Sequence, residues 1–310
     1  MSVFVQQQHS VCDFAGSDSW VILSEIEQSI KRKIEAVGTP LKDWDIQINY
    51  GIKTGYNDAF IISTEKRDEI LANCATDEER QRTAELIRPI LRGRDIKRYG
   101  YEWANLWLIA TFPSRNYDID EYPSVRDYLL TFGIEKLEQT GRTHIVNGET
   151  IKARKKTNNK WFETQDSISY WEDFNQPKIM WKIIGNRLAF AFDDNGVILN
   201  NACYLMTGEC LPFLLAFLNS KAILWYSFIT NMNPTGVGDS QVGAQNMIKF
   251  PIPRNKSLWD KLTSIIIKQQ TNKVSIEDVD ILIDREIAAF LNLTSDEMRF
   301  LTLFSHNLFK

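Results

Sequence analysis

A short loop with the sequence GIKTGYN, residues 51–57, combines residue types that can bind a ligand through hydrogen bonds. Its two glycines would allow the backbone to approach another molecule closely, because they carry no Cβ. The residues that we select as candidate contacts in this loop are Lys53, Thr54, Gly55, Tyr56 and Asn57. Such a loop suits a backbone phosphate or the edge of a base, and a plain hairpin turn is the alternative.

The spacing within this loop argues against a nucleotide-binding P-loop. Gly51 lies two residues before Lys53 instead of directly before it, and no earlier glycine has the required spacing. The glycines around Gly236 also lack the spacing of a dinucleotide-binding fingerprint. The sequence contains only three histidines and neither a G-x-S-x-G nor an H-E-x-x-H motif, and its four cysteines show no zinc-binding spacing. The sequence therefore predicts no catalytic residue and no metal site.

Positive residues concentrate in two segments of a chain whose net charge is −4. The first segment, residues 88–98, contains the candidate contacts Arg92, Arg94, Lys97 and Arg98. The second, residues 142–160, contains the candidates Arg154, Lys155, Lys156 and Lys160, and Trp161 follows it directly. Flexible cations bind phosphates, and a guanidinium can also read guanine in the major groove. A solvated surface is the alternative interpretation of either segment.

The elements that must position these residues form a mixed pattern, so we predict an α+β fold with two subdomains. Helices are expected over residues 21–37, where apolar residues recur at helical spacing, over 77–87, which begins with acidic residues and is followed by Arg88-Pro89, and over 122–139, 211–229, 257–270 and 276–291. Strands are expected over 43–62 on both sides of the loop, at 106–111, and as a small antiparallel set over 178–206. Residues 140–160 are polar and poorly periodic, which predicts a long loop. We expect a loose segment over 1–19, a recognition subdomain over 20–200 and a mostly helical subdomain over 201–310.

Composition indicates an ordinary soluble protein, with 44% hydrophobic and 25% charged residues. The most apolar run, residues 211–229, is interrupted by Asn219, Ser220 and Lys221, so a buried helix is expected there and no membrane span. Neither a signal peptide nor a disulfide pattern is recognisable, and this predicts a reduced, cytoplasmic protein.

Four segments, in this order, resemble a known family: KIEAVGTPLKDWDIQINYGIKTGYNDAFII, IRPILRGRDIKRYGYEWANLWLI, NKWFETQDSISYWEDFNQPKIMWK and FPIP. They are similar to the TaqI-like C-terminal specificity domain of adenine-N6 DNA methyltransferases and type IIG restriction–modification enzymes, over roughly residues 20–255. The resemblance implies recognition of double-stranded DNA, with residues 51–57, 91–98 and 160–161 facing the DNA. It also implies a separate methyltransferase domain that flips and methylates the adenine with S-adenosylmethionine.

The catalytic half of that family is not recognisable in this sequence. Neither a cofactor glycine motif nor an Asn/Asp-Pro-Pro-Tyr/Phe tetrapeptide occurs, and no nuclease motif is convincing. We therefore expect this chain alone neither to methylate nor to cut DNA, and to bind no cofactor itself. It would be part of a larger enzyme, or a split specificity subunit that works with a methyltransferase or nuclease chain. A protein–protein docking scaffold, or an enzyme with unrecognised catalytic residues, is the alternative.

Overall fold

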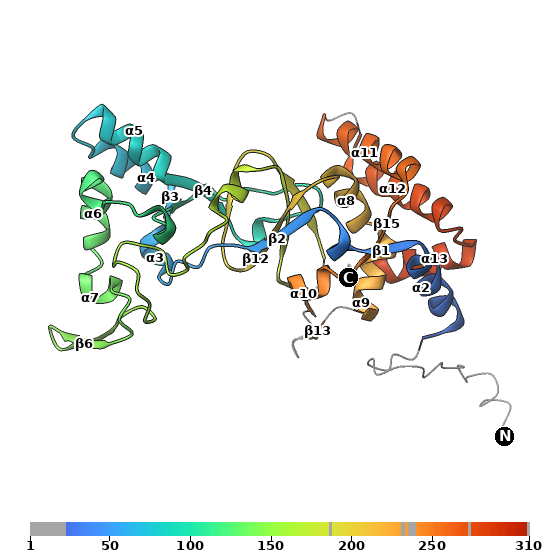
Figure 1. The fold of residues 1–310 in the computed structure, drawn as a ribbon, viewed down its shortest axis with the longest axis horizontal. Helices are drawn as coiled ribbons and strands as arrows, with labels where there is room; N and C mark the ends of the chain where they lie inside the picture. Colours follow the sequence, from blue (N-terminus) through green and yellow to red (C-terminus); the bar gives the residue numbers. More distant parts are fainter. Residues whose placement is uncertain (1–22, 186–187, 231–232, 235–239, 272–273, 309–310) are drawn as a thin grey trace, which may run out of the picture. The chain divides into compact units, whose positions relative to one another are not determined.

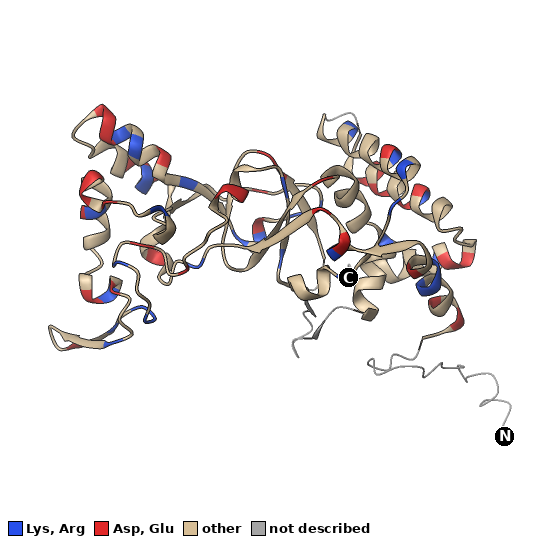
Figure 2. Cartoon of the chain, viewed as in Figure 1, with Lys and Arg blue, Asp and Glu red and all other residues tan. Residues whose placement is uncertain are grey.

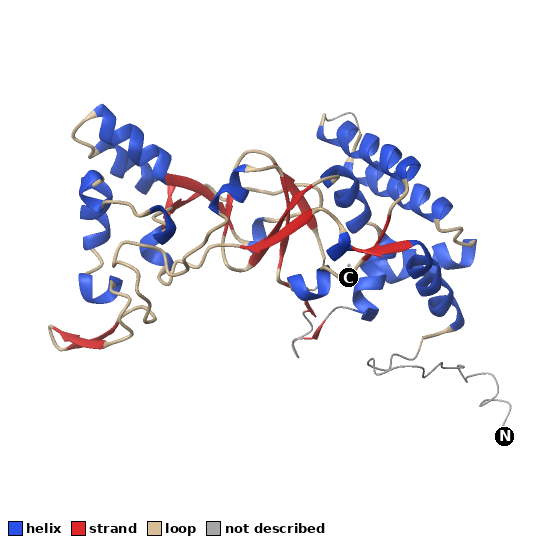
Figure 3. Cartoon of the chain, viewed as in Figure 1, coloured by secondary structure: helices blue, strands red, loops and turns tan. Residues whose placement is uncertain are grey.

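The computed structural model describes residues 23–308 except 186–187, 231–232, 235–239 and 272–273 (Figure 1). The segment expected to be loose, residues 1–19, lies outside the described residues. Helices and strands are mixed along the whole chain (Figure 3), which confirms the α+β prediction with helices at the C-terminal end. The chain divides into two compact units, and the first comprises the described parts of 1–46, 184–190 and 208–310. The second comprises residues 47–183 and 191–207.

This division differs from the expected boundary near residue 200, because the first described helix belongs with the C-terminal helices. That helix, α2 (Glu25–Val37), begins with a capping box in which Ser24 and Glu27 satisfy each other's backbone N–H groups. The strand after it, β1 (Gly38–Pro40), pairs antiparallel with β15 (Pro251–Pro253). Within the same unit, Lys33 Nζ lies 2.7 Å from the carboxylate of Glu297. Contacts between segments far apart in the sequence therefore place α2 and β1 in the same unit as the C-terminal helices.

The first unit is mainly helical. Its remaining elements are β9 (Ile184–Gly185), α8 (Leu211–Leu218), α9 (Lys221–Thr230), β13 (Asn233–Pro234), β14 (Ser240–Gln241), α10 (Ala244–Met247), α11 (Lys256–Gln270), α12 (Ile276–Phe290) and α13 (Ser295–Leu308). The sequence predicted α11 and α12 to within a residue or so at each end, and it missed α13.

The expected single helix over 211–229 is wrong, because α8 and α9 meet at a bend of 70°. Asn219 donates to the Leu215 carbonyl at the end of α8, while the Ser220 hydroxyl accepts from the Ile223 N–H at the start of α9. These polar residues replace the helix-internal bonds at the break. Among the described residues, no single helix is long and apolar enough to span a membrane, and only this bent pair, taken together, passes by length and composition.

The second unit contains two four-stranded sheets, ordered β10-β8-β12-β2 and β11-β4-β5-β3. Their strands are β2 (Ile46–Tyr50), β3 (Ile61–Ser63), β4 (Ile87–Leu91), β5 (Leu106–Ile109), β8 (Lys178–Lys182), β10 (Phe190–Asp193), β11 (Ile198–Leu199) and β12 (Cys203–Gly208). Strand β11 runs parallel to β4, so the strands over 178–206 do not form one antiparallel set as expected.

Short helices and one hairpin complete the second unit: α3 (Asn57–Phe60), α4 (Thr64–Ala72), α5 (Asp77–Leu86), α6 (Pro123–Leu130), α7 (Ile134–Leu137) and the strands β6 (Thr143–Val146) and β7 (Glu149–Lys152). The sequence did not predict α3 and α4. The helix expected over 122–139 is divided at Gly133, whose positive φ of 83° cannot continue a helix. The long loop expected over 140–160 contains the antiparallel β6–β7 hairpin.

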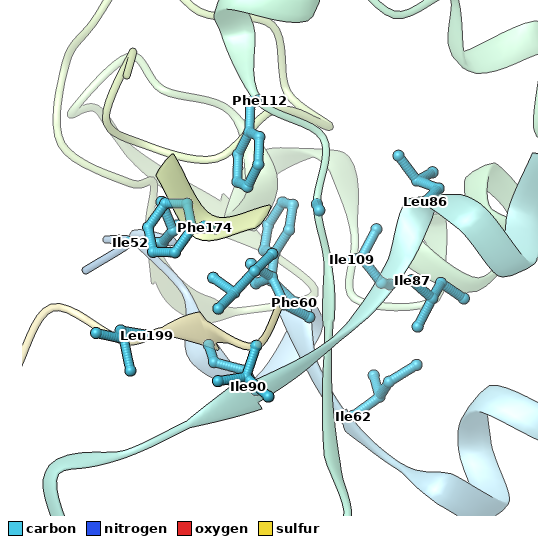
Figure 4. Close-up of a cluster of buried hydrophobic side chains, with 14 of the residues drawn as sticks. Ile52, Phe60, Ile62, Leu86, Ile87, Ile90, Ile109, Phe112, Phe174 and Leu199 are labelled. Atoms are coloured by element: carbon cyan, nitrogen blue, oxygen red, sulfur yellow. The ribbon is translucent and has the colours of Figure 1, made fainter. Parts of the chain in front are cut away.

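Apolar side chains from both sides of the loop 51–57, which we call the opening loop, form the core of this unit (Figure 4). Ile52 and Phe60, which lie before and after most of that loop, are fully buried beside Ile90 and Leu199. Burial of this apolar area holds the two ends of the loop in place.

Candidate nucleic-acid interface

Arg154 connects the segments that the sequence singled out. Its guanidinium Nη1 donates to the carbonyls of Thr54 at 2.9 Å and Glu163 at 2.8 Å. Nη2 donates to the Trp161 carbonyl at 2.5 Å, and Nε donates to Leu137 at 2.7 Å. Four backbone carbonyls from the opening loop, the end of α7 and the segment after the hairpin are thus held by one side chain.

Arg154 was expected to contact DNA directly, but the structure buries it. Its side chain is buried, with the residue 4% exposed, and burial lowers its pKa to about 10 despite the opposing effect of Glu163. A pKa of about 10 still leaves the guanidinium charged at neutral pH. Because its donors are engaged inside the unit, Arg154 positions the surrounding loops instead of meeting a phosphate.

The polar side chains of the opening loop mostly bond to one another. The Thr54 hydroxyl donates to Asn57 Oδ1 at 2.7 Å and accepts from the Tyr56 N–H at 3.2 Å. Thr54 itself is buried, and the Tyr56 ring meets the Phe132 ring edge-on with centroids 5.7 Å apart. Burial, together with the Asp58 charge, raises the pKa of the Tyr56 phenol. Thr54 and Asn57 therefore shape this turn.

The two glycines bring the loop close to other parts of the protein itself. A Cβ on Gly51 would lie 1.9 Å from the Asn200 carbonyl oxygen, so this position excludes any side chain. Gly55 has a φ of +80°, and a Cβ there would lie 2.9 Å from the Gln165 side chain. We expected these glycines to allow close approach to a ligand. In the structure they allow close packing against other residues of the same unit.

Lysines remain exposed on the loops that Arg154 holds. Lys53 is exposed, and its backbone carbonyl accepts from the Gln165 N–H at 3.0 Å. Lys155 and Lys156 are exposed directly after Arg154, and no ion pair involves any of these three ammonium groups in the described part of the chain. Three positive charges on adjoining backbone segments can meet the phosphates of a nucleic acid.

Lys160 and Trp161 are held at the end of the same region. The exposed Lys160 donates to the Tyr117 carbonyl at 3.4 Å, and its ammonium lies 5.4 Å from the centre of the Phe162 ring. Trp161 is half-buried and meets the Phe162 ring edge-on. Neither residue is as free to turn toward a ligand as the lysines just described.

The segment 92–98 forms a separate group of cations whose members differ in availability. Arg92 is engaged by Asp95 through Nε at 3.0 Å and Nη2 at 2.8 Å. Lys97 Nζ lies 3.4 Å from Glu102, and the Arg98 guanidinium lies 5.3 Å from the centre of the Tyr99 ring. Arg94 is exposed, and its guanidinium makes no ion pair in the described part of the chain.

Strand β11 links the two groups of candidates. Its Leu199 pairs in register with Leu91, just before the segment 92–98. Asn200, the residue directly after β11, forms a parallel bridge with Ile52 in the loop 51–57. The structure therefore connects both groups through one short strand, although among the described residues no hydrogen bond joins a candidate of one group to a candidate of the other.

Two positioning features were missed from the sequence. Gln139 is buried, and its amide nitrogen donates to the carbonyls of Lys160 at 3.1 Å and Glu163 at 3.0 Å. The β6–β7 hairpin turns at Asn147 and Gly148, whose φ values are 54° and 84°. The dipeptide Asn-Gly is the strongest short-range hairpin signal, so the sequence contained enough information to predict the hairpin. Nothing local in the sequence indicated the role of Gln139.

A model of the TaqI-like C-terminal specificity domain matches residues 88–252, more than half of the 310 residues. The chain belongs to this family. The match includes Arg94 and the whole Arg154-centred region apart from the opening loop.

The comparisons include two solved structures of restriction enzymes, and the first of them shares this fold. The type IIL restriction–modification enzyme MmeI, solved in complex with DNA, superimposes with a TM-score of 0.53 at 13% identity, covering 87% of this chain. The type IIG restriction endonuclease BpuSI gives a TM-score of 0.47 at 12% identity over 88% of this chain. The TaqI-like chain spans 36% of the length of MmeI and 32% of that of BpuSI.

In the parts of the chain that the structure describes, no group of three or more His, Cys, Asp or Glu residues could hold a metal ion. The sequence contains no glycine motif or catalytic tetrapeptide suited to S-adenosylmethionine.

Proposed function

We propose that this chain is a sequence-specific double-stranded DNA recognition module of a restriction–modification adenine methyltransferase. The observation that carries the proposal is the convergence of three backbone segments on Arg154 within a TaqI-like specificity domain. Those segments present Lys53, Lys155 and Lys156 to solvent. A positive, rigidly held surface of this kind suits the phosphates that fix a protein's register on a duplex.

In this proposal, buried residues hold the loops in place and different, exposed residues contact the DNA. Arg154 and Gln139 hold the loops from inside, so the exposed side chains meet the duplex with little loss of backbone freedom. Lys53, Lys155, Lys156 and Arg94 supply phosphate contacts. Lys160 and Trp161, at the edge of the same region, supply further contacts to the backbone or a sugar.

The catalytic steps belong, in this proposal, to a methyltransferase or nuclease domain or subunit of the same system. That partner would bind S-adenosylmethionine and flip the adenine, and this chain would determine where it acts. Mass measurements of the chain with and without a methyltransferase encoded beside it test the association. If the mixed chains show only the masses of the two separate proteins, a split-subunit arrangement is contradicted.

Substitution of exposed cations tests the DNA contact. Lys53→Ala and Arg94→Ala should each weaken binding to the preferred duplex and reduce the slope of log K against log salt by about 1. The slope is measured by fluorescence titration of the full chain at several salt concentrations. Circular dichroism should show an unchanged fold, because both side chains are exposed.

Lys249→Ala provides a matched control, since Lys249 is exposed in the first unit. It should leave both affinity and salt slope unchanged. The site itself is found by selecting bound duplexes from a random pool. A wild-type chain that enriches no sequence, or equal salt slopes for all variants, would contradict the proposal.

A further inference from the structure

The β6–β7 hairpin has two chemically different faces. Its register pairs Thr143 with Lys152 and Ile145 with Thr150, so these four side chains lie on one face. All four are exposed, and Ile145 is 80% exposed. None of them makes a side-chain hydrogen bond or ion pair within the described residues. We call this set the outer face.

The opposite face of the hairpin is directed at the protein. His144 pairs with Ile151, and both are partly buried, as is Val146. The His144 imidazole Nε2 lies 3.7 Å from the Glu138 carboxylate, just after α7. These contacts determine which face of the hairpin points outward.

The base of the hairpin is tied to Arg154. Antiparallel bonding continues below the strands, where Ala153 N–H donates to the Arg142 carbonyl at 2.9 Å and Gly141 N–H donates to the Arg154 carbonyl at 2.8 Å. The Arg154 N–H in turn donates to Glu138 at 3.0 Å. The same residue that holds the three loop segments by its side chain thus holds the hairpin by its backbone. The outer face is therefore presented in a defined orientation.

Charge around the hairpin favours a polyanionic partner. Between residues 142 and 160, the cations are Arg142, Lys152, Arg154, Lys155, Lys156 and Lys160, against the single acid Glu149. In Figure 2, Lys and Arg positions follow one another along the segment that leads away from the hairpin. Within its unit, the hairpin extends beyond α7 (Figure 1), and the side chains of the outer face are exposed.

We infer that the outer face of the β6–β7 hairpin enters the major groove of the target duplex and reads base edges there. This inference rests on the proposed function. A two-stranded ribbon fits the major groove, about 12 Å wide, and exceeds the minor groove, about 6 Å wide. The Thr143 and Thr150 hydroxyls can donate to or accept from base edges, and Ile145 can contact the methyl group of thymine. Lys152 can bind guanine or a phosphate.

Selection of duplexes from a random pool tests the inference, using the full chain as wild type, Ile145→Ala and Thr150→Val. Thr150→Val removes one hydroxyl and preserves the side-chain shape. Both variants should lose the base preference at one or two neighbouring positions and retain it elsewhere in the site. Affinity for the wild-type site should fall about tenfold for each, with an unchanged salt slope.

Leu130→Ala is the matched control, because Leu130 is another exposed apolar residue of the same unit, at 42% exposure. It should select the wild-type site with wild-type affinity. Hairpin variants that select the unchanged site with unchanged affinity would overturn the inference and leave the proposed function standing. An equal loss of affinity for every duplex would also overturn it, since this indicates phosphate contact alone. If the wild-type chain binds no duplex, the proposed function fails as well.

Discussion

Arg154 places a full positive charge inside the second unit, where its charge is balanced by hydrogen bonds to backbone carbonyls. Each of its nitrogens donates to at least one carbonyl oxygen. The guanidinium also lies 5.0 Å from the centre of the Phe60 ring. The planar fork of donors explains why an arginine stands here, since a lysine ammonium cannot reach the same set of acceptors.

Arg154→Ala should lower the free energy of unfolding by about 3 kcal/mol or more, because buried carbonyls lose their partners. Arg154→Lys should lower it by a smaller amount. Urea unfolding followed by tryptophan fluorescence measures both. The neighbouring Lys155→Ala serves as control and should keep wild-type stability, since Lys155 is exposed. Equal urea midpoints for Arg154→Ala and Lys155→Ala would show that the buried guanidinium does not stabilise the fold.

Asp95 makes stability depend on acid pH. Burial alone raises its pKa, but hydrogen bonds from the Arg92 side chain and backbone, with the charges of Arg92 and Arg94, lower the pKa overall. A carboxyl with a depressed folded-state pKa stabilises the fold above its unfolded pKa of about 3.9, and this contribution disappears as pH falls through the folded value. At neutral pH the contribution is therefore complete.

Asp95→Asn should cost about 1.5 kcal/mol at pH 7, because the bonds to Arg92 lose their charge. The difference from wild type should shrink at pH 3 and below. Urea midpoints at the two pH values measure it. A difference that is the same at both pH values would contradict a lowered pKa for Asp95.

The β6–β7 hairpin depends on its two-residue turn. Asn147 and Gly148 both have positive φ, as a type I′ turn requires. Gly148→Ala should strain the turn by about 1 kcal/mol and weaken the hairpin. Hydrogen exchange of the amides in β6 and β7 should become faster. Asn147→Gly keeps a residue pair that suits this turn and should retain protection. Unchanged exchange in Gly148→Ala would contradict the turn geometry.

Helix-end signals and apolar periodicity predicted different helices. The acidic first turn located α5, which begins at Asp77 with Thr76 as its cap, and apolar spacing located α12, which follows the capping residue Ser275. Periodicity failed where tertiary contacts decide the structure. The bend at Asn219 and the short β11 depend on partners far along the sequence.

The candidate site was predictable as a set of segments but not as a set of contacts. The glycine-containing loop 51–57 located Lys53, and charge clustering located Lys155, and the structure places both residues on exposed loops. Arg154 could not be distinguished from its exposed neighbours, because its acceptors lie at Thr54, Leu137 and Trp161. Only the folded chain shows that these carbonyls meet.

The path of the chain crosses between the two units four times, at 46–47, 183–184, 190–191 and 207–208. The described residues of the short stretch 184–190 belong to the first unit, whereas β8 before it and residues 191–193 of β10 after it lie in the second. Within the first unit, Asn219 holds this stretch by accepting from the Phe190 N–H at 3.1 Å and donating to its carbonyl at 2.9 Å. Neither unit is therefore a continuous piece of sequence.

Asn219→Ala should lower the free energy of unfolding by about 2 kcal/mol, because it removes two buried hydrogen bonds to the Phe190 backbone. Thermal and urea unfolding of the full chain measure the loss. Gln245→Ala, at an exposed position of the same unit, is the control and should be neutral. Identical stability of the two variants would mean that Phe190 finds other partners.

The outer face of the hairpin has a practical consequence for protein engineering. Thr143, Ile145, Thr150 and Lys152 support no other part of the described structure through hydrogen bonds, whereas the hairpin is anchored through Arg154. A library randomised at these positions should therefore yield mostly folded members, and selection on different targets could redirect the domain to new sites. Under the inference drawn above, substitutions on this face change recognition without lowering the stability of the scaffold.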